Sequence, residues 1–317
     1  MPLRFTLRQL EYLVAVGDCG SIALAARQVN VSSPSISAAI AQLEQEFGLP
    51  LFVRRHAQGL SLTQGGRQFV DEARAVLQAA GRLNDLANDI TGQVRGPLSV
   101  GCLLTFAQVV LPQLRRTFSA RFPEVSIRQT ECNQAEIFEG LRRAELDVAL
   151  TYDMQIPPDL EFVELVGLPP YALFDETHPL ADRNSVTPAE LAPFPMVLLD
   201  LPYSSDYFLS VFTRAGITPL IAERTRDLGV MRALVANGFG YSIANIRPSS
   251  DRAPDGMRLR YVPLDGSIAP MRMGLALAEG ARGMLTIRAF LDHCQTTITP
   301  DSAPGIRLRR DAPGAVG

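Results

Sequence analysis

A cluster of serines near the N-terminus combines hydroxyl groups with the start of a helix, and this combination suits contacts to nucleic acid. Ser32 is a good N-cap residue, and Pro34 is tolerated in the first turn because its missing N–H has no helical partner there. The outer face of the helix that follows is small and polar, so it can enter a major groove while its hydroxyls reach bases or phosphates. The residues expected to face DNA are Ser32, Ser33, Pro34, Ser35, Ser37, Ala38 and Gln42.

The apolar pattern predicts how this helix is held. One stripe recurs at i, i+3, i+4 and i+7 and is expected to face a core; it consists of Ile36, Ala39, Ile40 and Leu43. A shorter helix precedes it, capped by Ser21, with Arg27 near its end as a further expected DNA contact. A tight turn at 29–31 joins the two, and a helix over 6–17 supports them. The spacing indicates a helix-turn-helix, although any αα corner would show it too.

The segment 50–62 is short, contains glycine and is basic. Its alternation predicts a two-stranded wing with Arg54, Arg55 and His56 at the edge. Such cations can contact the sugar-phosphate backbone, which needs only position and charge. The alternative is a solvated loop.

These segments together resemble a known family. The ordered matches are Leu10–Val16, Ser21–Glu44, Leu49–Arg55 and Leu60–Arg67, and they resemble the N-terminal domain of LysR-type transcriptional regulators. The resemblance covers roughly the first 67 residues. It implies a winged helix-turn-helix over 1–62, double-stranded promoter DNA as the partner, and wing arginines on phosphate. The chain departs from the family at Ser33, Ala38 and Ala39, where longer polar side chains are usual.

The segment 63–92 predicts a long linker helix capped by Thr63. Apolar residues step by four and three in an unbroken heptad pattern, which favours a partner helix. The expected dimerisation residues are Phe69, Ala73, Val76, Ala80, Leu83, Ala87 and Ile90. The resemblance implies further assembly to a homotetramer, and RNA polymerase as a partner.

The remainder alternates strands and helices and predicts an α/β domain over 96–298, built around parallel strands with right-handed crossovers. The pattern restarts after Pro170, so two lobes are expected: lobe I from 96–167 and 271–298, and lobe II from 168–270. The family resemblance gives this effector domain a periplasmic-binding-protein-like fold. Residues 299–317, rich in Pro, Gly and Arg, are predicted to form a disordered tail.

Ligands of doubly wound sheets bind beyond the carboxyl ends of strands, between the lobes. The residues expected there are Leu104, Thr105, Phe106, Cys132, Asn133, Tyr152, Leu201, Pro202, Tyr203, Ser204, Ser205, Asn237, Gly238 and Asn245. Hydroxyls near helix N-termini beside aromatic walls favour a small, partly apolar molecule with a carboxylate or carbonyl group. The alternative is that the hydroxyls only cap helices.

Composition excludes several other functions. The 317 residues carry a net charge of −3, with 47% hydrophobic and 20% charged residues, as in a soluble globular protein. The chain contains no lysine, and five arginines face four acids over 1–62, so strong non-specific DNA binding is not expected. No apolar run approaches membrane-spanning length and no leader is evident, which favours the cytoplasm over a membrane or an exported solute-binding receptor.

Enzymatic and metal chemistry find little support in the sequence. No nucleophile–base constellation or phosphate loop is evident, and the cysteines and histidines lack zinc spacing, so neither catalytic residues nor a metal or other cofactor are expected. Cys102 and Cys132 fall at the ends of adjacent predicted strands. A redox-sensing regulator that bridges them is therefore an alternative to the small-molecule effector.

Overall fold

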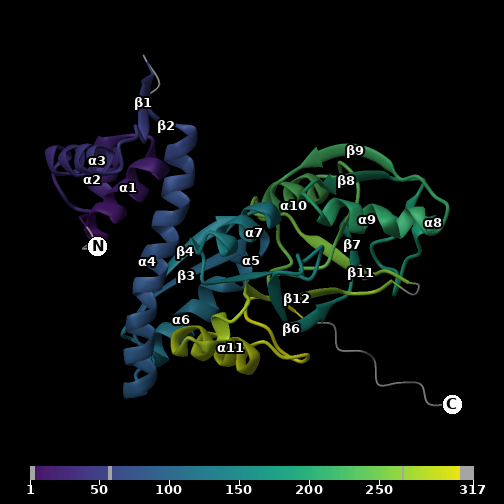
Figure 1. Cartoon of the computed structure of the whole chain (residues 1–317). Helices are drawn as coiled ribbons and strands as arrows, with labels where there is room; N and C mark the ends of the chain where they lie inside the picture. The colour runs from purple at the N-terminus through teal and green to yellow at the C-terminus, as the bar shows by residue number, and fades with distance from the viewer. Residues whose placement is uncertain (1–3, 56–58, 266–267, 308–317) are drawn as a thin grey trace. The chain divides into compact units, whose positions relative to one another are not determined.

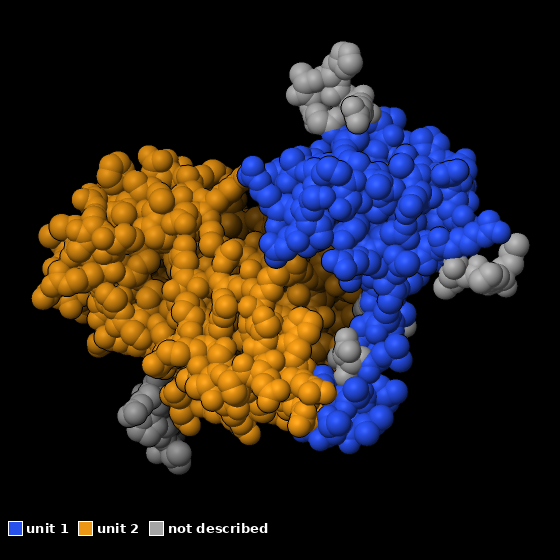
Figure 2. Space-filling view, turned by 90° about the vertical axis from the view of Figure 1, so that its left-hand side faces the viewer, with its two compact units in different colours: residues 1–92 blue, residues 93–317 orange. Residues whose placement is uncertain are grey.

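The computed structural model describes residues 4–55, 59–265 and 268–307. The chain divides into two compact units, Met1–Gly92 and Gln93–Gly317, which Figure 2 shows in different colours.

Three short helices form the body of the first unit: α1 (Leu7–Cys19), α2 (Ile22–Gln28) and α3 (Ser33–Phe47). Each begins at a side chain that accepts a hydrogen bond from a first-turn amide; these caps are Thr6, Ser21 and Ser32. The turn between α2 and α3 places Asn30 at φ 54°, a left-handed conformation that Asn tolerates better than most residues. The predicted stripe of α3 is buried, so the helix-turn-helix has its own core.

A two-stranded wing follows: β1 (Phe52–Arg55) pairs antiparallel with β2 (Gly59–Leu62). The Glu44 carboxylate of α3 accepts hydrogen bonds from the amides of Leu51 (2.7 Å) and Phe52 (3.2 Å). These bonds fix the start of the wing to α3. His56 lies outside the described residues.

The linker helix α4 (Gln64–Thr91) is 28 residues long and is capped by Thr63 (Figure 1). Its first turns pack on the helix-turn-helix. Ala73 is buried in that core, and the Phe69 ring lies 4.5 Å from the Phe47 ring. The prediction that Ala73 belongs to the partner-facing seam is therefore wrong, because the domain's own core covers it, whereas Phe69 is only partly buried. Further along, the exposed apolar residues are Val76, Leu83, Leu86 and Ile90.

Lobe I of the second unit is built on a five-stranded sheet. The strands are β3 (Gly96–Leu103), β4 (Val125–Cys132), β5 (Val148–Tyr152), β6 (Leu160–Leu168) and β12 (Met271–Ala278). Their order is β4-β3-β5-β12-β6; the first three are parallel, and β12 is antiparallel to both neighbours. β6 is a strand that the sequence pattern did not predict.

Helices cover both faces of this sheet. α6 (Leu111–Arg121) and α11 (Leu285–Thr297) lie against one face, where the Phe118 and Phe290 rings meet at 5.1 Å (Figure 1). α7 (Gln134–Arg142) packs on the other face. A short α5 (Leu104–Val109) follows β3 directly and precedes α6.

Lobe II contains β7 (Tyr171–Asp175), β8 (Pro195–Leu199), β9 (Leu220–Thr225), β10 (Ser242–Ala244) and β11 (Leu259–Pro263). β10-β7-β11 form an antiparallel sheet and β8-β9 a parallel pair. The Val197 amide donates to Tyr241 O at 2.7 Å, and this hydrogen bond joins the antiparallel sheet to the parallel pair. The helices of this lobe are α8 (Pro188–Leu191), α9 (Ser204–Thr213) and α10 (Leu228–Ala236).

The prediction of a disordered tail is wrong for residues 299–307. The Ser249 amide donates to Gly305 O, and the Arg307 amide donates to Arg247 O at 2.8 Å. Ala303 and Ile306 are buried, and this apolar contact holds the segment. A Cβ on Gly305 would lie 1.9 Å from Val109 O, so the close backbone approach requires glycine. Residues 308–317 lie outside the described residues.

Candidate functional sites

The outer face of α3 is open to solvent as predicted. Ser35, Ser37 and Ala38 are exposed, as are Pro34 and Gln42. Two of the predicted hydroxyls have structural roles: Ser32 Oγ accepts the Ser35 amide at 3.3 Å and lies 2.8 Å from Ser35 Oγ. The Ser37 hydroxyl has no hydrogen bond to any residue that the structure describes. It is therefore the hydroxyl most available to a base.

The other predicted DNA contacts are placed as follows. Gln42 accepts a hydrogen bond from Gln9 of α1 at 2.8 Å, and Arg27 is exposed near the end of α2. Ser33 is half-buried and is the first residue of α3. The backbones of Arg54 and Arg55 are the last residues of β1. These positions share the helix-turn-helix and wing of the first unit.

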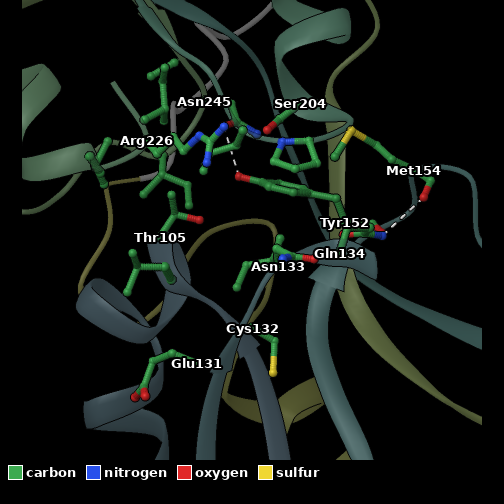
Figure 3. Close-up of a pocket in the computed structure, with 18 of the residues that line it drawn as sticks. Thr105, Glu131, Cys132, Asn133, Gln134, Tyr152, Met154, Ser204, Arg226 and Asn245 are labelled. Atoms are coloured by element: carbon green, nitrogen blue, oxygen red, sulfur yellow. Dashed lines mark hydrogen bonds between the residues drawn. The ribbon is translucent and has the colours of Figure 1, made fainter. Parts of the chain in front are cut away.

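A cavity of about 300 Å³ opens between the lobes of the second unit (Figure 3). Lobe I contributes residues that follow β3, β4 and β5, and lobe II contributes residues that follow β8, β9 and β10. The predicted residues that line it are Leu104, Thr105, Cys132, Asn133, Tyr152, Leu201, Pro202, Ser204 and Asn245. Additional lining residues are Leu103, Glu131, Gln134, Glu136, Met154, Leu199, Phe208, Arg226, Leu228, Ala244 and Ile246.

Five predicted residues, Phe106, Tyr203, Ser205, Asn237 and Gly238, do not line this cavity. Phe106 is fully buried, and its ring supports Tyr152 from behind at 4.7 Å. Tyr203 has φ 68° and turns its ring toward Phe138. Asn237 ends α10 and donates to Asp255 at 2.6 Å, and Gly238 continues that turn. Ser205 belongs to the first turn of α9, one residue past the lining Ser204.

Several polar groups in the cavity wall are held by the protein itself. Gln134 donates to the carbonyls of Tyr152 and Met154, both at 3.2 Å, and accepts from Thr151 Oγ1 at 2.6 Å. Asn133 and Glu136 form a capping box at the start of α7. Asn133, predicted only as a ligand contact, therefore also has a capping role. These polar groups are bonded within the protein and form the cavity wall, so other side chains are expected to recognise the ligand.

The hydroxyls of Thr105 and Ser204, unlike the polar groups above, are not held by the protein. Neither caps a helix: α5 starts after Leu103 and α9 after Tyr203, and neither start has a side-chain cap. Each residue is only 8% exposed, and neither hydroxyl has a hydrogen-bond partner in the described part of the chain. Both line the cavity, so both can donate to a bound molecule.

Charge is divided along the cavity. Arg226 lies at one end, and Glu131 lies at the opposite end (Figure 3). The Glu131 carboxylate accepts from Gln129 at 2.7 Å, and that of Glu136 accepts the Asn133 amide at 2.7 Å. The Arg226 end therefore suits a carboxylate or carbonyl oxygen. Arg226 follows β9, which the sequence analysis did not recognise; the rule that ligands lie at carboxyl ends of strands would have found it.

Cys102 and Cys132 are free thiols on opposite faces of the sheet. β3 and β4 pair Leu103 with Cys132 and Cys102 with Glu131, and successive side chains of a strand alternate between faces. Cys102 belongs to the core beneath α6 and α11, and Cys132 packs beside Leu103 on the α7 side. Burial raises the pKa of both thiols and disfavours the reactive thiolate. The geometry does not favour the bridge considered from the sequence.

The described residues hold no cluster of His, Cys, Asp and Glu fit for a metal ion. None of the helices among them is long and apolar enough to cross a membrane.

Comparisons with known proteins agree with both units. Residues 7–67 match the bacterial regulatory helix-turn-helix model of the LysR family, and residues 91–299 match the LysR substrate binding domain. The chain is a DNA-binding transcriptional regulator with an effector-binding domain, not an enzyme. It belongs to the LysR family.

Individual relatives cover most of the chain. It is 31% identical over 299 residues to the uncharacterised regulator YnfL of Escherichia coli, covering 92% of this chain and 98% of the relative. It is 32% identical over 256 residues to the regulator TcbR of a Pseudomonas species, covering 78% and 85%. The structure of HinK, a LysR family regulator from Pseudomonas aeruginosa, aligns with TM-score 0.63 at 32% identity, covering 93% and 99%. Full-length CbnR in complex with its target DNA aligns with TM-score 0.65 at 26% identity, covering 92% and 99%.

Proposed function

We propose that the effector of this regulator is a small, partly apolar molecule with a carboxylate or carbonyl group, bound in the cavity between the lobes. The observation that carries this proposal is the pair of unengaged hydroxyls, Thr105 and Ser204, in a cavity that also contains Arg226. Leucine and proline side chains line the same space and favour an apolar body. No cofactor beyond this molecule is needed.

The two hydroxyls come from different lobes, and this difference links binding to regulation. Thr105 belongs to lobe I and Ser204 to lobe II, so a ligand that contacts both favours the lobe arrangement that brings them together. It shifts the regulator by its difference in affinity between the two arrangements. Promoter binding or activation then follows the state of the lobes.

The test compares variants of three residues that line the cavity with a variant of a neighbouring serine. We expect Ser204→Ala, Thr105→Val and Arg226→Gln to weaken effector binding and to leave basal operator affinity nearly unchanged. Ser205→Ala is the matched control, because Ser205 does not line the cavity. A panel of carboxylates and carbonyl compounds is titrated by calorimetry, beside operator-binding curves. If the three variants bind the effector as the wild type does, the site is elsewhere.

We propose further that α3 enters the major groove and the wing contacts phosphate. The assigned DNA contacts are Arg27, Ser32, Ser33, Pro34, Ser35, Ser37, Ala38, Gln42, Arg54 and Arg55. The exposure of the α3 face supports the first part, and the basic end of β1 supports the second. Contacts to bases specify a sequence, whereas phosphate contacts position the protein.

The exposed apolar residues of α4 support a homodimer. Val76, Ala80, Leu83, Ala87 and Ile90 continue the heptad pattern beyond the helix-turn-helix core, and Leu83 is 70% exposed. Burial against a second copy would remove these side chains from water. We propose this dimer, and by family likeness a tetramer that contacts RNA polymerase at cytoplasmic promoters.

A further inference from the structure

A second, smaller cavity lies where the chain passes between the lobes. It has a volume of about 80 Å³ and is called the hinge cavity below. Pro169 and Pro170 of the first connection line it, as does Pro263 at the start of the second. Its polar lining consists of Tyr171, Asn245, Arg247 and Tyr261 of lobe II and Arg307 of the C-terminal segment. Among the described residues this lining contains two arginines and no acid.

Arg247 has hydrogen-bonding capacity that the protein does not use. Its guanidinium lies 4.6 Å from the centre of the Tyr261 ring, and its Nη2 is 3.5 Å from Asp251 Oδ1. Its Nε is buried and has no hydrogen-bond partner in the described structure. A buried donor without a partner is costly, and one that borders a cavity can be satisfied by whatever enters it.

The surroundings carry excess positive charge. Arg307 Nη1 binds the same Asp251 carboxylate at 3.0 Å, so two guanidinium groups share it. Arg232, whose guanidinium lies 5.8 Å from the centre of the Tyr261 ring, is only 5% exposed. It donates to the carbonyls of Ser250 and Arg252 and to the Tyr261 hydroxyl, all of them neutral acceptors. Arg247 and Arg307, both partly exposed, therefore share one described carboxylate, and this incompletely balanced positive charge at a cavity favours an anion.

We propose that the hinge cavity binds a small inorganic oxyanion of the phosphate or sulfate type. Arginine presents a planar fork of donors that matches such anions, and the buried Nε of Arg247 would gain an acceptor. The volume accommodates an ion of this size. The anion would contact lobe II and the C-terminal segment together, beside the proline-rich connection.

Calorimetric titration of the full-length protein in an anion-free zwitterionic buffer tests the site. The probes are inorganic phosphate and sulfate, with acetate as a planar comparison, and thermal unfolding is followed in parallel. We expect both tetrahedral ions to bind and raise Tm, and acetate to bind more weakly. Arg247→Gln and Arg307→Gln should each lower phosphate affinity at least tenfold. The use of two variants, one of them near the end of the described chain, keeps the test valid if the other fails to fold.

Two control variants show whether phosphate binding depends on the hinge cavity. Arg258→Gln removes an exposed arginine that pairs with Glu176 and does not line the hinge cavity, and it should bind phosphate as the wild type does. Arg226→Gln should also leave phosphate binding unchanged, because Arg226 lines only the larger cavity of the two. The proposal is overturned if the wild type binds neither ion, or if phosphate binding depends on Arg226 and not on Arg247.

Discussion

The hydroxyl of Tyr152 donates a hydrogen bond to Asn245 Oδ1 at 3.0 Å, and this bond joins the two lobes across the cavity wall. Tyr152 ends β5 in lobe I, and Asn245 follows β10 in lobe II. Burial raises the pKa of the tyrosine, so it remains a neutral donor. Asn245 also lines the hinge cavity, so one side chain borders both candidate sites.

Tyr152→Phe should lower the free energy of unfolding, because it removes a hydrogen bond between the lobes. The change deletes only the hydroxyl and leaves the oxygen of buried Asn245 without its partner, at a cost of about 1–3 kcal/mol. Urea unfolding measures the loss. Tyr203→Phe is the control, because its hydroxyl bonds to no described residue. Equal stability of the two variants would show that the bond contributes nothing.

Leu83→Asp should dissociate the dimer. The side chain is 70% exposed in the single chain and lies on the heptad seam, so a charge there would be buried against a partner at a cost of several kcal/mol. Ala80→Asp should act likewise. Ala75→Asp, at an exposed position off the seam, should leave the oligomer intact in sedimentation. The seam is misassigned if Leu83→Asp and Ala75→Asp sediment alike.

Arg54→Ala and Ser37→Ala should separate affinity from sequence preference. Loss of one phosphate contact weakens binding about equally for operator and random DNA, and flattens the salt slope by roughly one unit. Ser37→Ala should instead change preference among base pairs, by about 1 kcal/mol for a lost hydrogen bond. Titrations over a range of salt, with operator and scrambled duplexes, compare them. A changed preference in Arg54→Ala with an unchanged salt slope would reverse the assignments.

His178 should make lobe II less stable in mild acid. Its Nδ1 accepts the Leu180 amide at 3.2 Å, its Nε2 is buried without a described partner, and its ring stacks on Phe174. Burial lowers the pKa of this histidine below its usual value near 6.5. The unfolded chain therefore binds more protons, and stability falls as the pH drops through about 6.5.

His178→Gln keeps an acceptor and removes this titration, so its unfolding free energy should change less between pH 7 and 5 than that of the wild type. His293 also has a pKa lowered by burial, and His293→Gln serves as a separate comparison. Denaturant unfolding at several pH values gives the slopes. An unchanged slope in His178→Gln would exclude this histidine as a source.

Local signals predicted the helical unit well because its contacts are close in sequence. Ser32 and Thr63 are caps whose effect is confined to one turn, and the stripe of α3 repeats within eight residues. The same locality explains the error at Ala73. A heptad pattern shows that a helix face is covered, but not whether a second chain or the domain's own α1 covers it.

The missed strands depend on distant partners. β6 pairs with β12, more than a hundred residues later, and β9 has mostly exposed side chains along one edge of lobe II. Neither shows the buried run by which β3 and β5 were recognised. Arg226 was lost with β9, since the residue after a strand is a site candidate only once the strand is known. In lobe I, where β3, β4 and β5 were recognised, five of the ten residues that line the cavity were predicted.

The place of β12 in lobe I bears on how the protein is made. β12 lies between β5 and β6, yet it is the last to be synthesised of the strands that the structure describes. The first 92 residues contain all the contacts of their own core, so the DNA-binding unit can fold while the ribosome is still translating lobe II. Until residues 271–278 emerge, β5 and β6 have no strand between them. A nascent regulator therefore acquires its DNA-binding unit well before it acquires a cavity that can sense an effector.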